Sequence, residues 1–201
     1  IKILYGSKLM IIYISLLVSV LLIYPLWDLI DQRYLLSWLL LVVILVVLRT
    51  VSYVSYKRHY QPQLAKKYAL HFTLGSAGSG ILWGIAGALF FPEQSSEHQF
   101  YMLIIFTGMA AASLASLHAY LPVFYVFLVP ALIPIALIHL VQGDALHISL
   151  GIIILAFLIG VSYFGFNFNR SLLQTLHLRF ENVELVEQLR EQKEEAERAN
   201  I

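Results

Sequence analysis

Long apolar segments separated by short polar connections make up most of this chain. A helix needs about 20 mostly apolar residues to cross the hydrocarbon core of a bilayer. Candidate spans of that length lie at about Leu9–Leu26, Leu35–Tyr56, Ala69–Phe91, Phe100–Ala119, Leu121–Val141 and Ala145–Phe168. The fourth and fifth candidate spans are separated only at Tyr120-Leu121-Pro122. Because Pro122 suits the start of a helix, we expect a tight helical hairpin here. We therefore expect an all-α fold with a polytopic six-helix transmembrane bundle over residues 1–168.

The pattern changes after Phe168. Residues 169–201 contain neither Gly nor Pro and carry seven of the twelve acidic residues of the chain. Their apolar positions recur at heptad spacing, which is typical of the a/d seam of a coiled coil. The predicted seam consists of Leu178, Asn182, Leu185, Leu189, Gln192 and Ala196. We expect a cytoplasmic, parallel, homodimeric coiled coil that leads to an output domain outside this chain. The alternative is a plain amphipathic helix that lies on its own domain.

Composition agrees with the membrane class. The chain is 60% hydrophobic, whereas a soluble domain is about 45–50% apolar, and its mean hydropathy is +0.79. It has no cysteine, which excludes disulfides and thiolate metal sites. A net charge of +1 gives no reason to expect a nucleic-acid partner. The first apolar run lacks a small-residue cleavage site, so we expect it to be retained as a span.

Basic residues in the connections predict the orientation. The connection after the second predicted span carries Lys57, Arg58, Lys66 and Lys67. The connections after the first, third and fifth spans together carry one basic residue, Arg33, and all the acidic residues that lie in connections. Because cytoplasmic connections are enriched in Lys and Arg, six spans with both termini in the cytoplasm satisfy this rule throughout.

Small residues are concentrated in the third and fourth predicted spans. Gly80 and Gly84 form a GxxxG motif, and Gly108 and Ala112 lie on a similar face of the next span. Lipid tails provide no hydrophobic drive for helix association, so small residues are used to bring helix backbones close together. We expect these four residues to pack the third span against the fourth. In a second interpretation, the same Gly-rich stretch yields when a ligand binds.

The fifth predicted span contains Pro130 and Pro134, which remove backbone hydrogen bonds and bend a helix. The carbonyls freed at Val126 and Pro130 then need other partners. The bend is either purely structural or it opens a pocket for a small amphipathic molecule. We take as candidate ligand-binding residues the polar or aromatic groups near small or bent backbone: Trp83, Ser113, His118, Tyr120 and Tyr125.

Arg49 is the only formal charge inside a predicted span, and we add it to the candidate ligand-binding residues. It either extends to the membrane surface or faces the bundle, where it would contact backbone carbonyls or an anionic ligand head. No phosphate-binding loop, nucleophile elbow or carboxylate pair is visible, so we expect no catalytic residue in this chain. The histidines lack metal-ligand spacing, so we expect no metal site.

The tail LRFENVELVEQLREQKEEAERANI resembles the linker helix of bacterial membrane-bound hybrid sensor histidine kinases. The stretches ILWGIAGALFFP, GMAAASLASL and YLPVFYVFLVPALIP look like the multi-span sensor region that precedes this linker, and the resemblance covers about Tyr56 to Ile201. It implies a histidine kinase in the parent protein, ATP and Mg only for that missing kinase domain, a response regulator as partner and location in the bacterial inner membrane. His177 does not match the phospho-acceptor motif.

Together these features predict the sensor region of a two-component histidine kinase. We expect it to relay an intramembrane or lipophilic small-molecule signal through a dimeric C-terminal helix to autophosphorylation. Its expected partners are a second copy of the chain, membrane lipid and a small lipophilic signal, with no cofactor in this chain. The alternatives are the sensor of a diguanylate cyclase, a transporter-like protein with a regulatory tail, and a passive dimeric anchor. The two halves of the chain show no convincing inverted repeat, which a transporter would favour.

Overall fold

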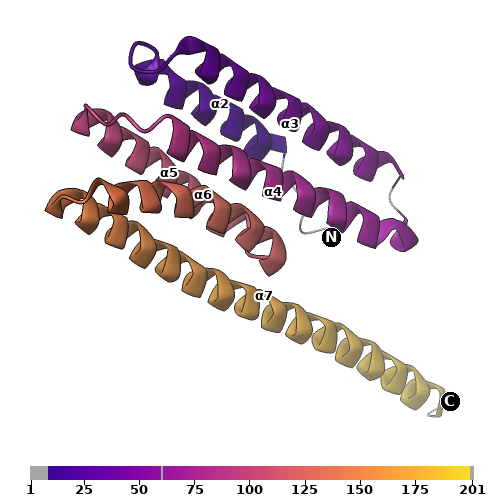
Figure 1. Cartoon of the computed structure of the whole chain (residues 1–201). Helices are drawn as coiled ribbons and strands as arrows, with labels where there is room; N and C mark the ends of the chain where they lie inside the picture. The colour runs from indigo at the N-terminus through magenta and orange to yellow at the C-terminus, as the bar shows by residue number, and fades with distance from the viewer. Residues whose placement is uncertain (1–8, 60, 200–201) are drawn as a thin grey trace.

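The computed structural model describes the backbone of residues 9–59 and 61–199, and the side chains of residues 12–59, 61 and 63–195. In these ranges the chain is helical, without a β-strand (Figure 1). The elements are α2 (Leu9–Leu26), α3 (Gln32–His59), the short 3-10 helix η1 (Pro62–Leu64), α4 (Ala65–Leu89), α5 (Ser96–Leu117), α6 (Leu121–Gln142) and α7 (Ala145–Ala199).

Helices α4 and α6 form the centre of the bundle. Helix α3 packs on α4, and α7 packs on α6, which gives a layer in the order α3, α4, α6, α7 (Figure 1). The helices α2 and α5 contact each other; α2 also packs on α3, and α5 packs on α6 and α7. Every polar connection therefore lies at one of the two ends of the bundle.

Among the described residues, five helices are long and apolar enough to cross a membrane: α3, α4, α5, α6 and the first part of α7. The apolar segment Ile12–Leu26 of α2 is shorter. Leucine side chains cover the outer surface of α3, where Leu40 and Leu48 are about 60% exposed. So much exposed apolar surface is rare in a soluble monomer and suits contact with lipid. The chain has the helices of a multi-pass membrane protein.

The predicted spans agree with the observed helices except at their ends. Helix α3 extends the second predicted span to Gln32–His59, and α4 begins at Ala65, four residues before the predicted start. Most of the added residues are polar, and a helix tolerates polar residues once it has left the hydrocarbon. The sixth predicted span and the charged tail form one helix, α7, of 55 residues. At a rise of 1.5 Å per residue this helix is about 80 Å long.

The closest helix contact joins α4 to α6. A Cβ added to Gly80 would overlap the backbone of Phe127, and one added to Gly84 would overlap the carbonyl oxygen of Pro130. Since Pro134 has no N–H, that carbonyl lacks its usual helical donor. In glycine a Cα–H takes the place of the Cα–Cβ bond, so at Gly84 a Cα–H is directed toward this oxygen, an arrangement that recurs at helix interfaces.

The expected packing of the third span against the fourth is therefore wrong: the glycines of α4 pack on α6. A Cβ added to Gly108 would meet no atom within 4 Å, and Ala112 lines a cavity. The reason lies in the partner helix. The bent α6 presents bare backbone to the glycine face of α4, whereas the small-residue face of α5 has no matching contact among the described residues.

We predict that Gly84→Ala destabilises the bundle by about 1–3 kcal/mol, because the new methyl group forces α4 away from α6. The midpoint of thermal unfolding in detergent should fall. Gly108→Ala is the matched control: its methyl group enters open space, and alanine favours a helix over glycine by about 1 kcal/mol. Equal stability of the two variants would show that the α4–α6 contact is not tight.

Candidate functional site

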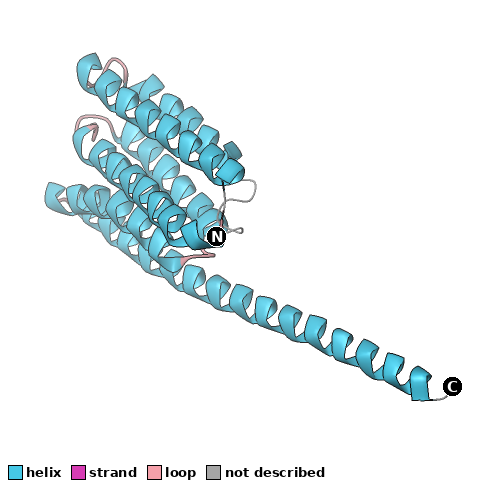
Figure 2. Cartoon of the chain, turned by 90° about the vertical axis from the view of Figure 1, so that its right-hand side faces the viewer, coloured by secondary structure: helices cyan, strands magenta, loops and turns pink. Residues whose placement is uncertain are grey.

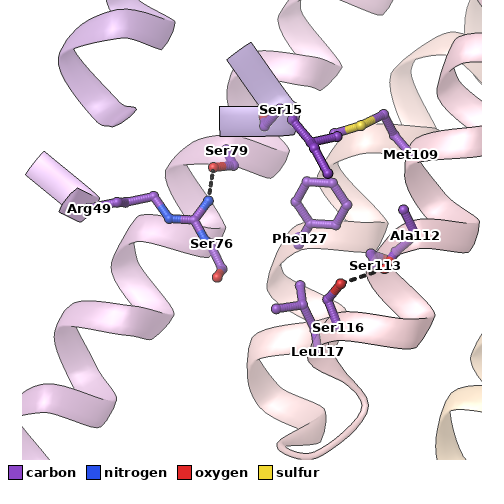
Figure 3. Close-up of a pocket in the computed structure, with 11 residues that line it drawn as sticks. Ser15, Arg49, Ser76, Ser79, Met109, Ala112, Ser113, Ser116, Leu117 and Phe127 are labelled. Atoms are coloured by element: carbon purple, nitrogen blue, oxygen red, sulfur yellow. Dashed lines mark hydrogen bonds between the residues drawn. The ribbon is translucent and has the colours of Figure 1, made fainter. Parts of the chain in front are cut away.

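A partly open cavity of about 60 Å³ lies between α2, α4, α5 and α6, and Arg49 reaches it from α3 (Figure 3). Its apolar walls include Met109, Leu117 and Phe127. Its polar lining consists of Arg49 and the serines Ser15, Ser76, Ser79, Ser113 and Ser116. A guanidinium group therefore shares a small, otherwise apolar space with several hydroxyl groups.

Arg49 is held against α4. Its Nη1 donates a hydrogen bond to Ser79 Oγ at 2.8 Å, and that hydroxyl donates to the carbonyl oxygen of Gly75 at 3.0 Å. The guanidinium carbon lies 5.9 Å from the ring centroid of Phe72. A Cβ at Gly75 would come within 3.0 Å of Arg49 Cγ, so the absent side chain leaves room for the arginine. Of the two interpretations of Arg49, the structure selects the one in which it faces the bundle.

Ser76 is the second notable polar group of the cavity. It is completely buried, and its Oγ has no hydrogen-bond partner among the described residues. Leaving a buried hydroxyl without a partner costs about 1–3 kcal/mol. Ser76 lies three residues before Ser79, so the two hydroxyls share one face of α4. On this face the Ser79 hydroxyl is hydrogen-bonded to Arg49, whereas the Ser76 hydroxyl has no hydrogen-bond partner among the described residues.

A groove of about 430 Å³ lies on the other side of Arg49, between α3 and α4. It is mostly apolar, and its open side is flanked by Leu48, Val51 and Leu74, each about 60% exposed. Arg49 lines both this groove and the inner cavity. The arginine is therefore accessible from the lipid-facing surface as well as from inside the bundle.

The structure brings together only part of the predicted ligand-binding set. Arg49 and Ser113 line the cavity. Trp83 belongs instead to the aromatic core: its ring lies 5.7 Å from Trp38 and 5.5 Å from Phe106 in edge-to-face contacts. Trp83 is 2% exposed and lies outside this cavity, but it lines a smaller neighbouring pocket together with Arg49 and Ser79.

His118, Tyr120 and Tyr125 lie near α7 or at the end of α5. The carbonyl oxygen of His118 accepts a hydrogen bond from Asn169 Nδ2 at 2.8 Å, and Tyr125 donates to the Ser162 carbonyl at 3.4 Å. Tyr120 precedes α6 and is partly exposed. None of the three lines the cavity around Arg49. His118 and Tyr125 thus connect α5 and α6 to α7, and the ring of His118 also lies 6.0 Å from that of Phe168.

Sequence reasoning missed Ser76, Ser79, Met109 and Phe127 as cavity residues. The two serines lie within the Gly-rich run of α4, where small residues suggest close helix packing. The sequence did contain one signal: the two serines are three residues apart on the helix that also carries Gly75, the glycine that lies against Arg49. Met109 and Phe127 are ordinary apolar residues that carry no such signal.

A second polar cluster lies at the opposite end of the bundle. His147 Nε2 lies 2.9 Å from Gln99 Oε1, and Gln99 Nε2 donates to the carbonyl of Pro92 at 3.1 Å. The other ring nitrogen of His147 contacts the carboxylate of Asp144. His139, completely buried, lies 5.8 Å from His147 between ring centroids. In the described part of the chain, no three His, Asp or Glu side chains form a group that could hold a metal ion.

Asp144 also begins α7. Its Oδ1 accepts hydrogen bonds from the backbone N–H groups of Leu146 and His147, each at 3.1 Å, as an N-cap residue does. The backbone N–H of His147, and then its ring, hold the pKa of the Asp144 carboxyl below its ordinary value. This cluster therefore fixes the start of α7 and joins it to α5.

Comparisons with known protein families, with curated proteins and with solved structures found no match to this chain. Its function is therefore inferred from the two polar clusters, from the course of α7 and from the sequence itself.

We predict that Asp144→Ala lowers the midpoint of thermal unfolding more than Asp144→Asn does, because asparagine keeps the N-cap acceptor. The difference in the midpoint of thermal unfolding between the wild type and Asp144→Asn measures the stabilisation that comes from the carboxylate charge. Since the pKa of Asp144 is lowered, this stabilisation is present at neutral pH and disappears as the pH falls through the lowered value. A difference that grows on acidification would contradict the assignment.

Proposed function

We propose that this chain is the membrane-embedded input region of a bacterial sensor histidine kinase. In this proposal α7 relays a change inside the bundle to a kinase domain outside the chain. The observation that carries the proposal is the continuity of α7, which is one helix from Ala145 to Ala199 and projects beyond the bundle (Figure 2). The resemblance of the tail to hybrid-kinase linkers supports a kinase as the output.

Contacts between the cavity and α7 support a relay. Phe127 and Leu117 line the cavity. One turn from Phe127, the ring of Phe124 packs against Gly165 of α7, where a Cβ would lie within 2.6 Å of it. Directly after Leu117, the His118 carbonyl accepts the hydrogen bond from Asn169. A change in the cavity that moves α5 or α6 would therefore move α7 where it leaves the bundle.

The distribution of charge supports six spans with both termini in the cytoplasm of a bacterial inner membrane. The basic segment between α3 and α4 lies at the end of the bundle from which α7 projects (Figure 1). Cytoplasmic connections are enriched in Lys and Arg. In this arrangement α2 is the first span, and its 18 residues are near the lower limit for crossing the hydrocarbon.

The exposed stripe on the distal half of α7 supports a parallel homodimer. Leu178, Leu185 and Leu189 are each more than 50% exposed in the single chain. Val186 lies beside this stripe, whereas Phe180 and Val183 lie on the side of the helix that carries Glu187; all three are 65% exposed or more. An apolar stripe on a helix outside a membrane is stabilised when another surface covers it. The seam positions Asn182 and Gln192 are also exposed, and the side chain of Ala196 lies outside the described residues.

Disulfide cross-linking tests the dimer. The chain has no cysteine, so a single Leu185→Cys substitution gives one reactive site per chain. We predict that oxidation in membranes joins two copies through this position, because seam residues of parallel helices face each other. Glu187→Cys, on the opposite side of the helix, is the matched control and should cross-link little. Equal cross-linking at both positions would contradict the predicted seam.

Signal relay is tested with the chain joined through its own tail to a histidine kinase domain. We predict that Ser171→Pro uncouples kinase activity from the membrane region, because an interior proline costs about 3 kcal/mol and bends or breaks the helix. Ser171→Ala should leave the response unchanged. Unchanged regulation in the proline variant would contradict a relay through continuous α7. Regulation that survives replacement of residues 1–168 by an unrelated dimeric anchor would show that the bundle senses nothing.

A further inference from the structure

Arg49 lies where a ligand from the bilayer could reach the inside of the bundle. It lines both the α3–α4 groove and the inner cavity. Its hydrogen bond to Ser79 and its contact with Phe72 hold the guanidinium in place. A guanidinium has five donors in a planar fork that matches a carboxylate or a phosphate. The group therefore selects a ligand with an anionic head.

Ser76 provides a second, independent indication of a ligand. It is 0% exposed, lines the same cavity as Arg49, and its Oγ has no partner among the described residues. A hydroxyl donates one hydrogen bond and accepts others. An acceptor atom bound between Arg49 and Ser76 would satisfy this hydroxyl and remove the cost of its burial.

The size of the cavity limits the head. Its volume of about 60 Å³ is several times the roughly 10–15 Å³ that one water molecule needs, so it has room for a small group of atoms. A carboxylate, with three heavy atoms, is compatible with this space. A phosphodiester head with its glycerol and two acyl chains is much larger than the cavity.

The groove between α3 and α4 suits the rest of the ligand. It measures about 430 Å³, and its apolar lining is formed by Leu45, Leu48, Val51 and Leu74. Because it is open to the lipid-facing surface, a chain could enter it laterally without crossing water. One apolar chain and one carboxylate head together match the groove and the cavity that share Arg49.

We propose that Arg49 and Ser76 bind the carboxylate of a single-chain amphiphile, a fatty-acid-like anion, whose chain lies in the α3–α4 groove. This inference rests on the proposed function, because it gives the chemical class of the signal that the bundle detects. In the bound state the carboxylate accepts hydrogen bonds from the guanidinium and from Ser76. Binding then draws α3 and α4 together around the cavity that α5 and α6 complete.

The test uses the full chain in nanodiscs of phosphatidylcholine, with radiolabelled dodecanoate as the probe at mildly alkaline pH. Binding is corrected for partition into nanodiscs without protein. We expect saturable binding that unlabelled dodecanoate displaces and methyl dodecanoate, which lacks the charge, does not. This comparison uses only the wild-type chain and so does not depend on the folding of any variant.

Two substitutions test the named residues. Arg49→Gln should weaken binding about a hundredfold, because it removes a charge-assisted, two-pronged hydrogen bond. Ser76→Ala should weaken binding about tenfold while thermal stability stays equal or rises, because the buried hydroxyl has no partner to lose. The controls are Arg33→Gln, at an exposed arginine paired with Asp31, and Ser149→Ala, at an exposed serine of α7. Both should bind as wild type does.

The inference is overturned if methyl dodecanoate competes as well as dodecanoate, or if binding survives both Arg49→Gln and Ser76→Ala. It is also overturned if nanodiscs of anionic phosphatidylglycerol abolish the binding, because the site would then belong to a bilayer phospholipid. Kinase output is measured separately on the fused chain. Binding that depends on Arg49 and Ser76, without any effect on output, would support the site and contradict the proposed sensory function.

Discussion

The close contact between α4 and α6 is the constraint on which the rest of the bundle depends. In a bilayer, apolar side chains gain nothing by leaving lipid for protein, so helices associate through close packing and polar contacts. Gly80 and Gly84 allow the backbone of α4 to reach the backbone of α6, and the prolines of α6 leave a carbonyl that a glycine can approach. The other helices arrange around this pair: α3 on the far side of α4, and α7 on the far side of α6.

The same contact accounts for the cavity. Because α4 packs tightly on α6, it cannot also pack tightly along the small-residue face of α5, and space remains near Ser113 and Ala112. Arg49 enters this space over Gly75, where a larger residue would push it away. A charged group within a membrane span is costly and is stabilised by polar partners. The cavity, the glycine and the serine face of α4 together make that charge tolerable.

The sequence predicted the positions of the helices well and their partners poorly. Apolar run length located each of the six apolar helices to within a few residues, and the absence of Gly and Pro after Phe168 predicted the long tail helix. Whether Gly80 and Gly84 pack on α5 or on α6 depends on where α6 bends, and a single sequence does not contain that information. The hydrogen bond from Asn169 goes to the backbone carbonyl of His118, which any residue possesses, so no side-chain pattern could indicate that bond. Arg49 was recognisable because an isolated charge among apolar residues requires an explanation.

The length of α7 has a mechanical consequence. Beyond Asn169, thirty described residues extend to Ala199, about 45 Å at 1.5 Å per residue. The contacts of α7 with His118 and Phe124 lie where the helix leaves the bundle, so α7 would pivot about them. A tilt of about 5° there would displace the far end by roughly 4 Å, more than the rise of two helical residues. Movements too small to reorganise the bundle would thus be magnified at the far end, provided that the helix between them stays stiff.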